Sequence, residues 1–393
     1  MKPGLTILFC LLSLSLFSQE PAVQQDSVVE NRNFIERIKD KTSQYMDGML
    51  VHMGPIDLNL GGTIRYSAFR GFYFGIPLST NDRFSRHIRL SVFGGYWTKL
   101  RAFDYGAEGK WLINRERQME LGVRFKHKSS ALGEFSNLDE DANLLSENQY
   151  RYTFYENVMA RGNSIEAFYN TQLGRHFNTI LTFGTYEKHY YLAPFDTLPN
   201  QHFTNAEVRL HFDNPSIWLC YQHSFKDVLG GEYDFDRLKL QVEKGFQTLF
   251  FGKFSMLLQA GYASASCPVM ETFNLLGSYD LVGLYSPGSF ATMRESEFFC
   301  DRFAALFLWH DFQGSLWDPD LLFFKPQLTV STALGWGRPS LTYGYFESGF
   351  VVKGLFYTPW VNVGAGVFYR YGHYALPKTI DNFSFKYSIT LAL

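Results

Sequence analysis

The chain ends in Phe383-Ser384-Phe385-Lys386-Tyr387-Ser388-Ile389-Thr390-Leu391-Ala392-Leu393. Large apolar side chains occupy every second position of this stretch, and small or polar side chains occupy the positions between them. Because successive side chains of a β-strand point to opposite faces, the pattern predicts a strand with one apolar and one polar face. Lys386 puts a charge on the polar face, which is therefore predicted to face water and not a protein core.

The same alternation returns upstream, near residues 120–126, 205–212, 237–243 and 361–371. Each run carries charges on one face only, so neither a soluble sandwich nor a sheet buried on both faces would accept these strands. We predict that the charged faces line a water-filled lumen. The predicted lumen-lining residues are Arg124, Lys126, Glu207, Arg209, Arg237, Lys239, Glu243, Arg370 and Lys386.

Composition favours a membrane protein built from strands. Aromatic residues make up 18% of the 393 residues and charged residues 19%, against about 25% charged in typical soluble domains. The mean hydropathy of −0.15 and the recurrent charges exclude a bundle of transmembrane helices, which need about 20 consecutive apolar residues each. The formal net charge of −2 gives no basic footprint for nucleic acid.

These features together predict an all-β fold, a transmembrane antiparallel β-barrel. Such barrels alternate lipid-facing and lumen-facing residues, and lipid forces their backbone to pair completely, which closes the sheet. Turn signals such as Asn114-Arg115-Glu116 and Gly230-Gly231 separate the runs. We count about sixteen strands, in line with the even strand numbers of these barrels, over residues 56–393.

Residues 1–18 are predicted to be a secretory signal peptide, which implies export and location in the cell outer membrane. Lys2 supplies the positive start, Leu5 to Phe17 the apolar stretch, and Ser18-Gln19 a cleavage point. The remaining cysteines, Cys220, Cys267 and Cys300, lack framework spacing, so we expect no structural disulfide.

Residues 19–55 read as a periplasmic linker with a short amphipathic helix. Ser27 and Glu30 fit a capping box. Apolar residues then recur at helical spacing up to Met49, and Gly48 or Gly54 would end the helix. One interpretation places this helix at the membrane surface, and the alternative places it in the barrel as a plug.

Three stretches are too long for tight turns and are predicted to be long extracellular loops, with inward folding as an open alternative, at residues 131–160, 190–203 and 266–294. The strand over residues 298–312 is apolar on both faces. Its lumen side should therefore pack against something other than water, and we hypothesise that a loop or the N-terminal helix fills that part of the lumen.

The sequence contains no convincing pattern for catalysis, metal binding or cofactor binding. His223 and Ser224 are adjacent on a strand and so point to opposite faces. Asp139, Asp141 and Asn143 resemble the start of a calcium loop, but the required Gly and bidentate Glu are absent further on. We therefore predict no enzymatic activity, no metal and no cofactor. The inward charges have mixed sign, and we expect them to pair with one another across the lumen wall.

One family resemblance is carried by Arg294-Glu295-Ser296-Glu297-Phe298-Phe299-Cys300-Asp301-Arg302-Phe303, together with residues 79–90, 103–106, 368–377 and 385–388. These stretches resemble the barrel domain of a Gram-negative outer-membrane family whose function is unassigned. Its members usually carry a carboxypeptidase-regulatory-like domain before a barrel similar to those of BamA/TamA-type assembly factors. The family-like motif residues are Arg294, Glu297, Asp301 and Arg302.

The resemblance implies a role in outer-membrane protein assembly or export. About 37 residues lie between the predicted signal peptide and barrel, too few for the family's sandwich or for POTRA modules. We therefore expect a scaffold or subunit that works in outer-membrane lipid with a protein partner of the envelope. The alternative is a passive, porin-like diffusion channel for small solutes. The first expectation requires an occluded lumen, and the second requires an open one.

Overall fold

The computed structural model divides into two compact units, Met1–His52 and Met53–Leu393. In the first, β1 (Met46–Asp47) pairs antiparallel with β2 (Leu50–Met53). The predicted helix is therefore wrong at Met46 and Asp47, because their backbone pairs with Val51 and Leu50. The signal peptide and the rest of that helix lie outside the described residues, which are 46–47, 50–60, 63–132, 159–191, 198–213, 215–248, 252–312, 323–358 and 361–391.

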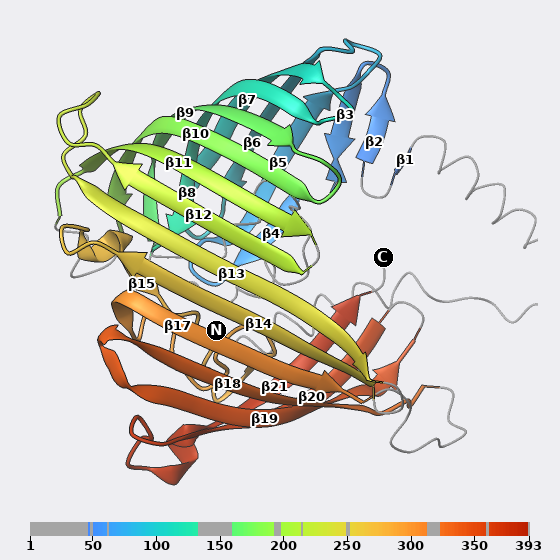
Figure 1. Ribbon diagram of the computed structural model, residues 1–393. Helices are drawn as coiled ribbons and strands as arrows, with labels where there is room; N and C mark the ends of the chain where they lie inside the picture. The colour runs from blue at the N-terminus through green and yellow to red at the C-terminus, as the bar shows by residue number, and fades with distance from the viewer. Residues whose placement is uncertain are drawn as a thin grey trace, which may run out of the picture. The chain divides into compact units, whose positions relative to one another are not determined.

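The second unit is built almost entirely of strands (Figure 1). Its described helical residues form two short 3₁₀ turns, η5 (Val269–Glu271) and η6 (Thr379–Asn382). The strands are β3 (Ile56–Asn59), β4 (Ile64–Ser67), β5 (Gly71–Thr80), β6 (Ile88–Trp97), β7 (Ala102–Asn114), β8 (Met119–Ala131), β9 (Met159–Gln172), β10 (Phe177–Tyr190), β11 (Gln201–Asp213), β12 (Ser216–Ser224), β13 (Phe235–Thr248), β14 (Gly252–Ala263), β15 (Phe273–Asn274), β16 (Val282–Leu284), β17 (Phe299–Asp311), β18 (Gln327–Pro339), β19 (Leu341–Tyr357), β20 (Val361–Tyr371) and β21 (Phe383–Leu391).

The long strands form an up-and-down meander. From β5 to β14, and again from β17 to β21, each strand pairs antiparallel with the next, and β14 pairs with β17 across the intervening segment. Figure 1 shows these strands following one another in a continuous curve.

The described residues contain 21 strands, where the sequence predicted about sixteen. The added strands are the short β1, β2, β15 and β16, of two to four residues each. The first wall strand is also broken, because β3 and β4 both pair with β5. Alternation of side chains could not reveal pieces this short.

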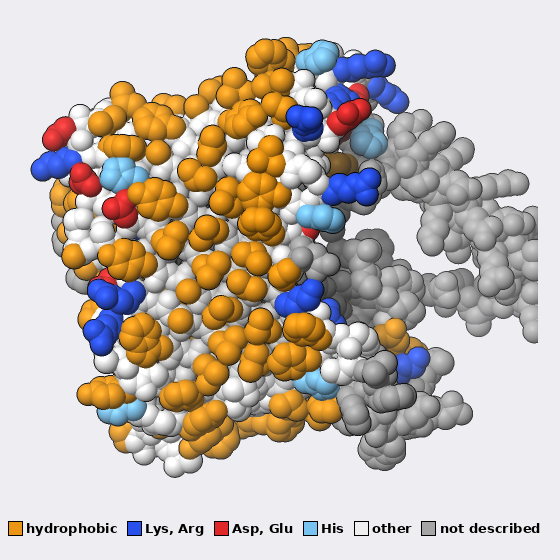
Figure 2. All heavy atoms as spheres, in the orientation of Figure 1, with side chains coloured by type: hydrophobic (Ala, Val, Ile, Leu, Met, Phe, Trp, Pro, Cys, Tyr) orange, Lys and Arg blue, Asp and Glu red, His pale blue; other side chains and the backbone are white. Residues whose placement is uncertain are grey.

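The two faces of the sheet differ in polarity, as the alternation of polar and apolar residues along the sequence predicted. On β21, Ser384, Lys386 and Ser388 are buried whereas Phe385 is 43% exposed. On β13, Arg237, Lys239 and Gln241 are buried whereas Leu238 is exposed. The face with buried polar side chains is called the inward face here. Figure 2 shows hydrophobic side chains covering the outward face, with charged ones gathered toward the strand ends.

No helix among the described residues is both long enough and apolar enough to cross a membrane. Cys220, Cys267 and Cys300 are free and buried. The predicted calcium-like residues Asp139, Asp141 and Asn143 lie outside the described residues.

Candidate functional site

The candidate functional site is the connection between β14 and β17, residues 264–298, which we call the inner segment. It contains η5, β15 and β16, and Figure 1 draws it in gold and orange beside β14 and β17. Many of its side chains are buried, including Phe273, Phe290 and Met293, which have no exposed surface. Since the sequence predicted an extracellular loop here, its burial shows that it folds back against the sheet.

Apolar packing holds the inner segment to the inward face of β17. Phe290 lies 4.8 Å from Phe307, and Phe273 lies 5.1 Å from Phe303, measured between ring centroids. β15 also pairs with β17 through Phe273 and Cys300. The strand that is apolar on both faces thus packs against a loop. Of the two coverings that we hypothesised for it, a loop or the N-terminal helix, the loop is confirmed.

Two glycines of the sheet make room for this packing. A Cβ on Gly335 of β18 would lie 2.8 Å from Cζ of Phe290, and one on Gly261 of β14 would lie 2.6 Å from Phe303 and 2.8 Å from Phe273. All three distances are too short for real carbon atoms, so any larger side chain would push the phenyl rings away. Glycine in a strand often marks this kind of close approach.

The inner segment also adds a strand to the edge of β21. β16 pairs parallel with Phe385–Tyr387, the backbone N–H of Phe385 donates to Leu281 O at 2.9 Å, and that of Tyr285 donates to Tyr387 O at 2.8 Å. β20 occupies the other edge. At these positions the free edge of the last strand, β21, therefore pairs with the inner segment. In a simply closed barrel, this edge would pair with the first strand instead.

A buried carboxylate on β19 fixes the middle of the inner segment. Glu347, 2% exposed, accepts the backbone N–H groups of Ala291 at 2.7 Å and Thr292 at 2.8 Å. It also accepts the Thr292 hydroxyl at 2.5 Å. A carboxylate with several such donors is a strong anchor, because charge-assisted hydrogen bonds are roughly twice as strong as neutral ones.

Two predicted lumen-lining cations hold the segment from neighbouring strands. Arg370 of β20 donates to Glu297 Oε1 at 2.7 Å, and its guanidinium lies 4.7 Å from the ring of Tyr345. Lys386 of β21 donates to the backbone oxygen of Ser278. Both side chains are 2% exposed, so these contacts replace the water that such cations would otherwise require.

Glu271 of η5 joins the inner segment to β10 and β13. Its carboxylate accepts Lys188 Nζ of β10 at 2.6 Å and Arg237 Nη1 of β13 at 3.2 Å. Burial by itself would raise the pKa of Glu271, but the two cations outweigh burial and hold that pKa below its usual range. Folded protein therefore keeps Glu271 ionised more readily than unfolded protein does.

This lowered pKa predicts a pH dependence for the inner segment. The stabilisation by Glu271 is present above the usual carboxyl range and is lost as the pH falls through the lowered pKa. We expect hydrogen–deuterium exchange of peptides covering residues 269–275, corrected for intrinsic rate, to rise on acidification. In the Glu271→Gln variant, these peptides should exchange faster already at neutral pH. Their further rise in exchange on acidification, which we call the acid step, should be smaller.

Asp234→Asn is the matched control, because Asp234 is an exposed carboxylate of the loop between β12 and β13. It should leave both the neutral rate and the acid step unchanged. An acid step of the original size in Glu271→Gln would remove Glu271 as its cause.

The other predicted lumen-lining residues do not hold the inner segment. Arg124 Nε of β8 donates to Glu166 of β9, and Arg209 Nε donates to Glu207 on the same strand, β11. Lys239 is buried, Lys126 is half-buried and Glu243 is exposed. The expectation of mutual pairing is thus right for Glu207 and Arg209. It is wrong for Arg124, whose partner Glu166 is not one of the predicted residues, and for the three cations that bind the inner segment.

The family-like motif is divided between two environments. Glu297 belongs to the inner segment, where its Oε2 accepts the backbone N–H of Arg294 at 2.8 Å, and its Oε1 binds Arg370. Arg294 is exposed, with its guanidinium 5.8 Å from the ring of Tyr279. Asp301 and Arg302 of β17 form a local pair at 3.3 Å and take no part in holding the segment.

Sequence reasoning missed Lys188, Glu271 and Glu347. Glu271 and Lys188 lie in or beside stretches read as loops, so no alternation marked them. Glu347 lies within the 17-residue strand β19, whose other charged residue is Lys353, and its immediate neighbours are aromatic and small residues. Its position in an otherwise apolar run was the one available signal.

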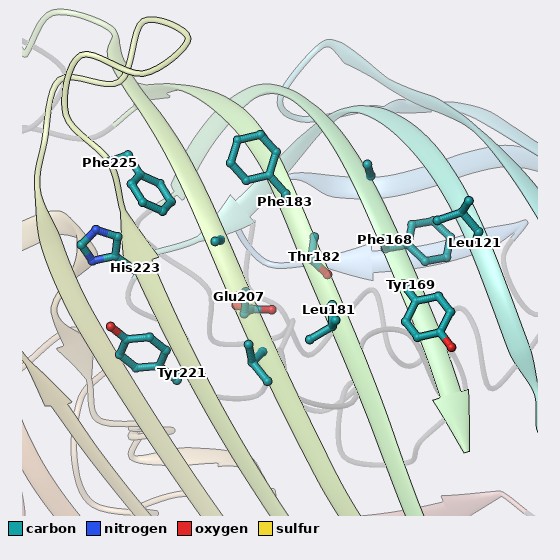
Figure 3. A pocket seen from close by; sticks show the side chains of 13 residues that line it. Leu121, Phe168, Tyr169, Leu181, Thr182, Phe183, Glu207, Tyr221, His223 and Phe225 are labelled. Atoms are coloured by element: carbon teal, nitrogen blue, oxygen red, sulfur yellow. The ribbon is translucent and has the colours of Figure 1, made fainter. Parts of the chain in front are cut away.

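A concavity of about 670 Å³ lies over β9–β12. Figure 3 shows Leu181, Phe183, Tyr221 and His223 around it. Ala206 lies in register between Phe183 and His223, so a small side chain between larger ones produces the hollow. Leu181, Phe183 and Tyr221 are exposed, which puts the concavity on the outward apolar face.

The polar groups at this concavity do not form a catalytic arrangement with Ser224. His223 Nδ1 lies 2.9 Å from Asp236 Oδ1, which also accepts the Tyr221 hydroxyl at 2.6 Å. Ser224 is fully buried on the inward face. Among the described residues, no group of three or more His, Cys, Asp or Glu side chains is placed to hold a metal ion.

Neither a family model nor a curated protein sequence matches this chain. Several solved structures are similar to it in fold. BamA of Haemophilus ducreyi lacking POTRA domains 1–3 is 8% identical with a TM-score of 0.56, over 94% of this chain and 79% of that one. CdiB of Escherichia coli is 12% identical with a TM-score of 0.47, and covers 84% of this chain and 61% of that one.

CdiB of Acinetobacter baumannii is 13% identical with a TM-score of 0.45, over 84% of this chain and 58% of that one. The chain thus spans about three fifths of the two CdiB chains and four fifths of the BamA chain. The likeness to BamA concerns backbone architecture, since so few residues are identical. The meander of long strands, with polar side chains inward and apolar ones outward, is a β-barrel fold similar to that of BamA.

Proposed function

We propose that this chain is an integral outer-membrane β-barrel protein without enzymatic activity, which acts as a scaffold or subunit in outer-membrane protein assembly or export. In this proposal residues 1–18 are a cleaved signal peptide, and β3 with β4 counts as one broken strand, which gives a wall of sixteen strands. Outer-membrane lipid surrounds the wall, and a protein partner of the envelope completes the machine.

The outward face supports membrane insertion. Its exposed side chains include Ile76, Val123, Ile165 and Phe350, from strands spread along the meander. The long strands from β5 to β20 pair on both edges, which lipid requires of any backbone that crosses it. A face of this kind would aggregate in water but is stabilised in hydrocarbon.

The observation that carries the proposed role is the inner segment. It is held by side chains of β10, β13, β19, β20 and β21, and its aromatic rings pack among those of β17. A diffusion channel needs a lumen open to water along its wall. A segment packed in this way favours the occluded barrel of an assembly or export subunit over the porin-like alternative.

Single-channel recording in a planar bilayer tests the proposal. We expect the purified, refolded chain to be electrically silent while it still shows heat-modifiable barrel migration on gels, because the inner segment occupies the lumen. Steady ohmic openings of the unmodified chain would instead support the diffusion channel and reject the scaffold role.

A further inference from the structure

Three consecutive short turns at one end of the strands carry a group of arginines, which we call the arginine rim. The turns join β5 to β6, β7 to β8, and β9 to β10. The rim consists of Arg83, Arg86, Arg115, Arg117 and Arg175 on the turns, and of Arg89 at the start of β6. All except Arg89 are exposed.

Hydrogen bonds join the three turns into one surface. Arg115 donates from Nη1 and Nη2 to Asp82 at 2.8 and 2.9 Å, and from Nε to Arg86 O at 3.0 Å. The backbone N–H of Gln172 donates to Arg117 O at 2.7 Å, which links the second turn to the third. The three turns therefore lie side by side.

The rim has an excess of positive charge. Its turns contain the two carboxylates Asp82 and Glu116, and Asp82 is shared by Arg89 and Arg115. Within the described part of the chain, Arg83, Arg86, Arg117 and Arg175 have no ion-pair partner. At the other end of the strands, the turn between β12 and β13 has Asp227, Glu232 and Asp234 against Lys226.

Exposed apolar side chains adjoin the rim on the outward face. Phe84 is 51% exposed, Ile88 46%, Trp111 56% and Leu173 55%. Arginines directly beyond an apolar belt stand at the depth of lipid phosphates, and aromatic residues such as Trp111 favour that same boundary. Figure 2 shows Lys and Arg side chains clustered at the upper right of the apolar surface.

We propose that the arginine rim binds the headgroups of anionic phospholipids in the leaflet that faces the short turns. Guanidinium groups bind phosphate in a bidentate manner, and a cluster of them selects lipids with net negative charge over zwitterionic ones. This inference rests on the proposed membrane location but not on the assembly role.

Trp111 provides the readout, because it is exposed on the outward face next to the rim. The full chain is reconstituted in bilayers that mix phosphatidylglycerol and phosphatidylcholine, with bromine on the acyl chains of one lipid or the other. We expect brominated phosphatidylglycerol to quench tryptophan fluorescence in excess of its bulk fraction, and Trp111→Phe to remove most of that excess. The lipid preference should be on the order of tenfold and should fall with added salt.

The triple variant Arg83→Gln, Arg86→Gln, Arg117→Gln should lose the excess quenching. The matched control Arg101→Gln, Lys226→Gln, Lys378→Gln removes three exposed charges outside the rim and should keep it. Equal quenching by both lipids in the unmodified chain, or an excess that survives the rim variant, would overturn the proposal. Absence of quenching by either lipid would instead show that the chain does not insert, which rejects the proposed membrane location itself.

Discussion

Replacing residues 266–297 with a short Gly-Ser linker is expected to turn an electrically silent protein into one with steady ohmic openings. The linker removes Phe290 and Met293, which have no exposed surface, and so uncovers the inward faces of β17 and β18. It also removes the partners of Arg237, Arg370 and Lys386. Those three cations would then face water, as the walls of conducting barrels do.

The deletion also has a stability cost, because Phe303 and Phe307 lose their apolar partners. Each variant must therefore first show heat-modifiable migration before its conductance is recorded in planar bilayers. Replacing residues 226–232 with the same linker is the control, since this turn lies outside the inner segment. A folded deletion variant that stays silent would contradict the plug role of the inner segment.

Glu347→Ala is expected to lower the free energy of unfolding by about 3 kcal/mol, because it leaves buried backbone N–H groups without an acceptor. These are the N–H groups of Ala291 and Thr292, and the Thr292 hydroxyl loses the same partner. Urea unfolding in detergent micelles, followed by tryptophan fluorescence, measures the change. Trypsin cleavage after the exposed Arg294 should accelerate as the inner segment loosens.

Glu116→Ala is the control, because Glu116 is an exposed carboxylate on a turn, and its removal should change stability by less than about 0.5 kcal/mol. If Glu347→Ala does not refold, Glu347→Gln keeps an acceptor of similar shape and should show a smaller loss. Equal unfolding midpoints for Glu347→Ala and Glu116→Ala would show that Glu347 does not anchor the segment.

The long strands and their faces could be predicted from sequence because the information is local. In β21, the apolar positions led by Phe385 and the polar positions led by Lys386 alternate within nine residues, and the alternation assigns each side chain to a face without knowledge of its neighbours. The apolar inward side of β17 also showed, from sequence alone, that something must cover Phe303 and Phe307.

The contacts of the inward charges could not be predicted in the same way. Arg237 was expected to pair with another wall residue and instead binds Glu271, which is 34 positions away in a segment without alternation. Arg370 binds Glu297 across 73 positions and Lys386 binds Ser278 across 108. No periodicity encodes partners at such separations.

The sequence by itself determined the all-β class, the position of most long strands, and which side chains face inward or outward, because β-structure repeats every two residues. Only the tertiary structure decided that residues 264–298 cover the inward face, that β16 pairs with the edge of β21, and that Glu347 anchors the segment. These features depend on bringing together β10, β13 and β17–β21 through curvature of the whole sheet. Curvature is a property of all the strands together, whereas alternation is a property of each strand alone.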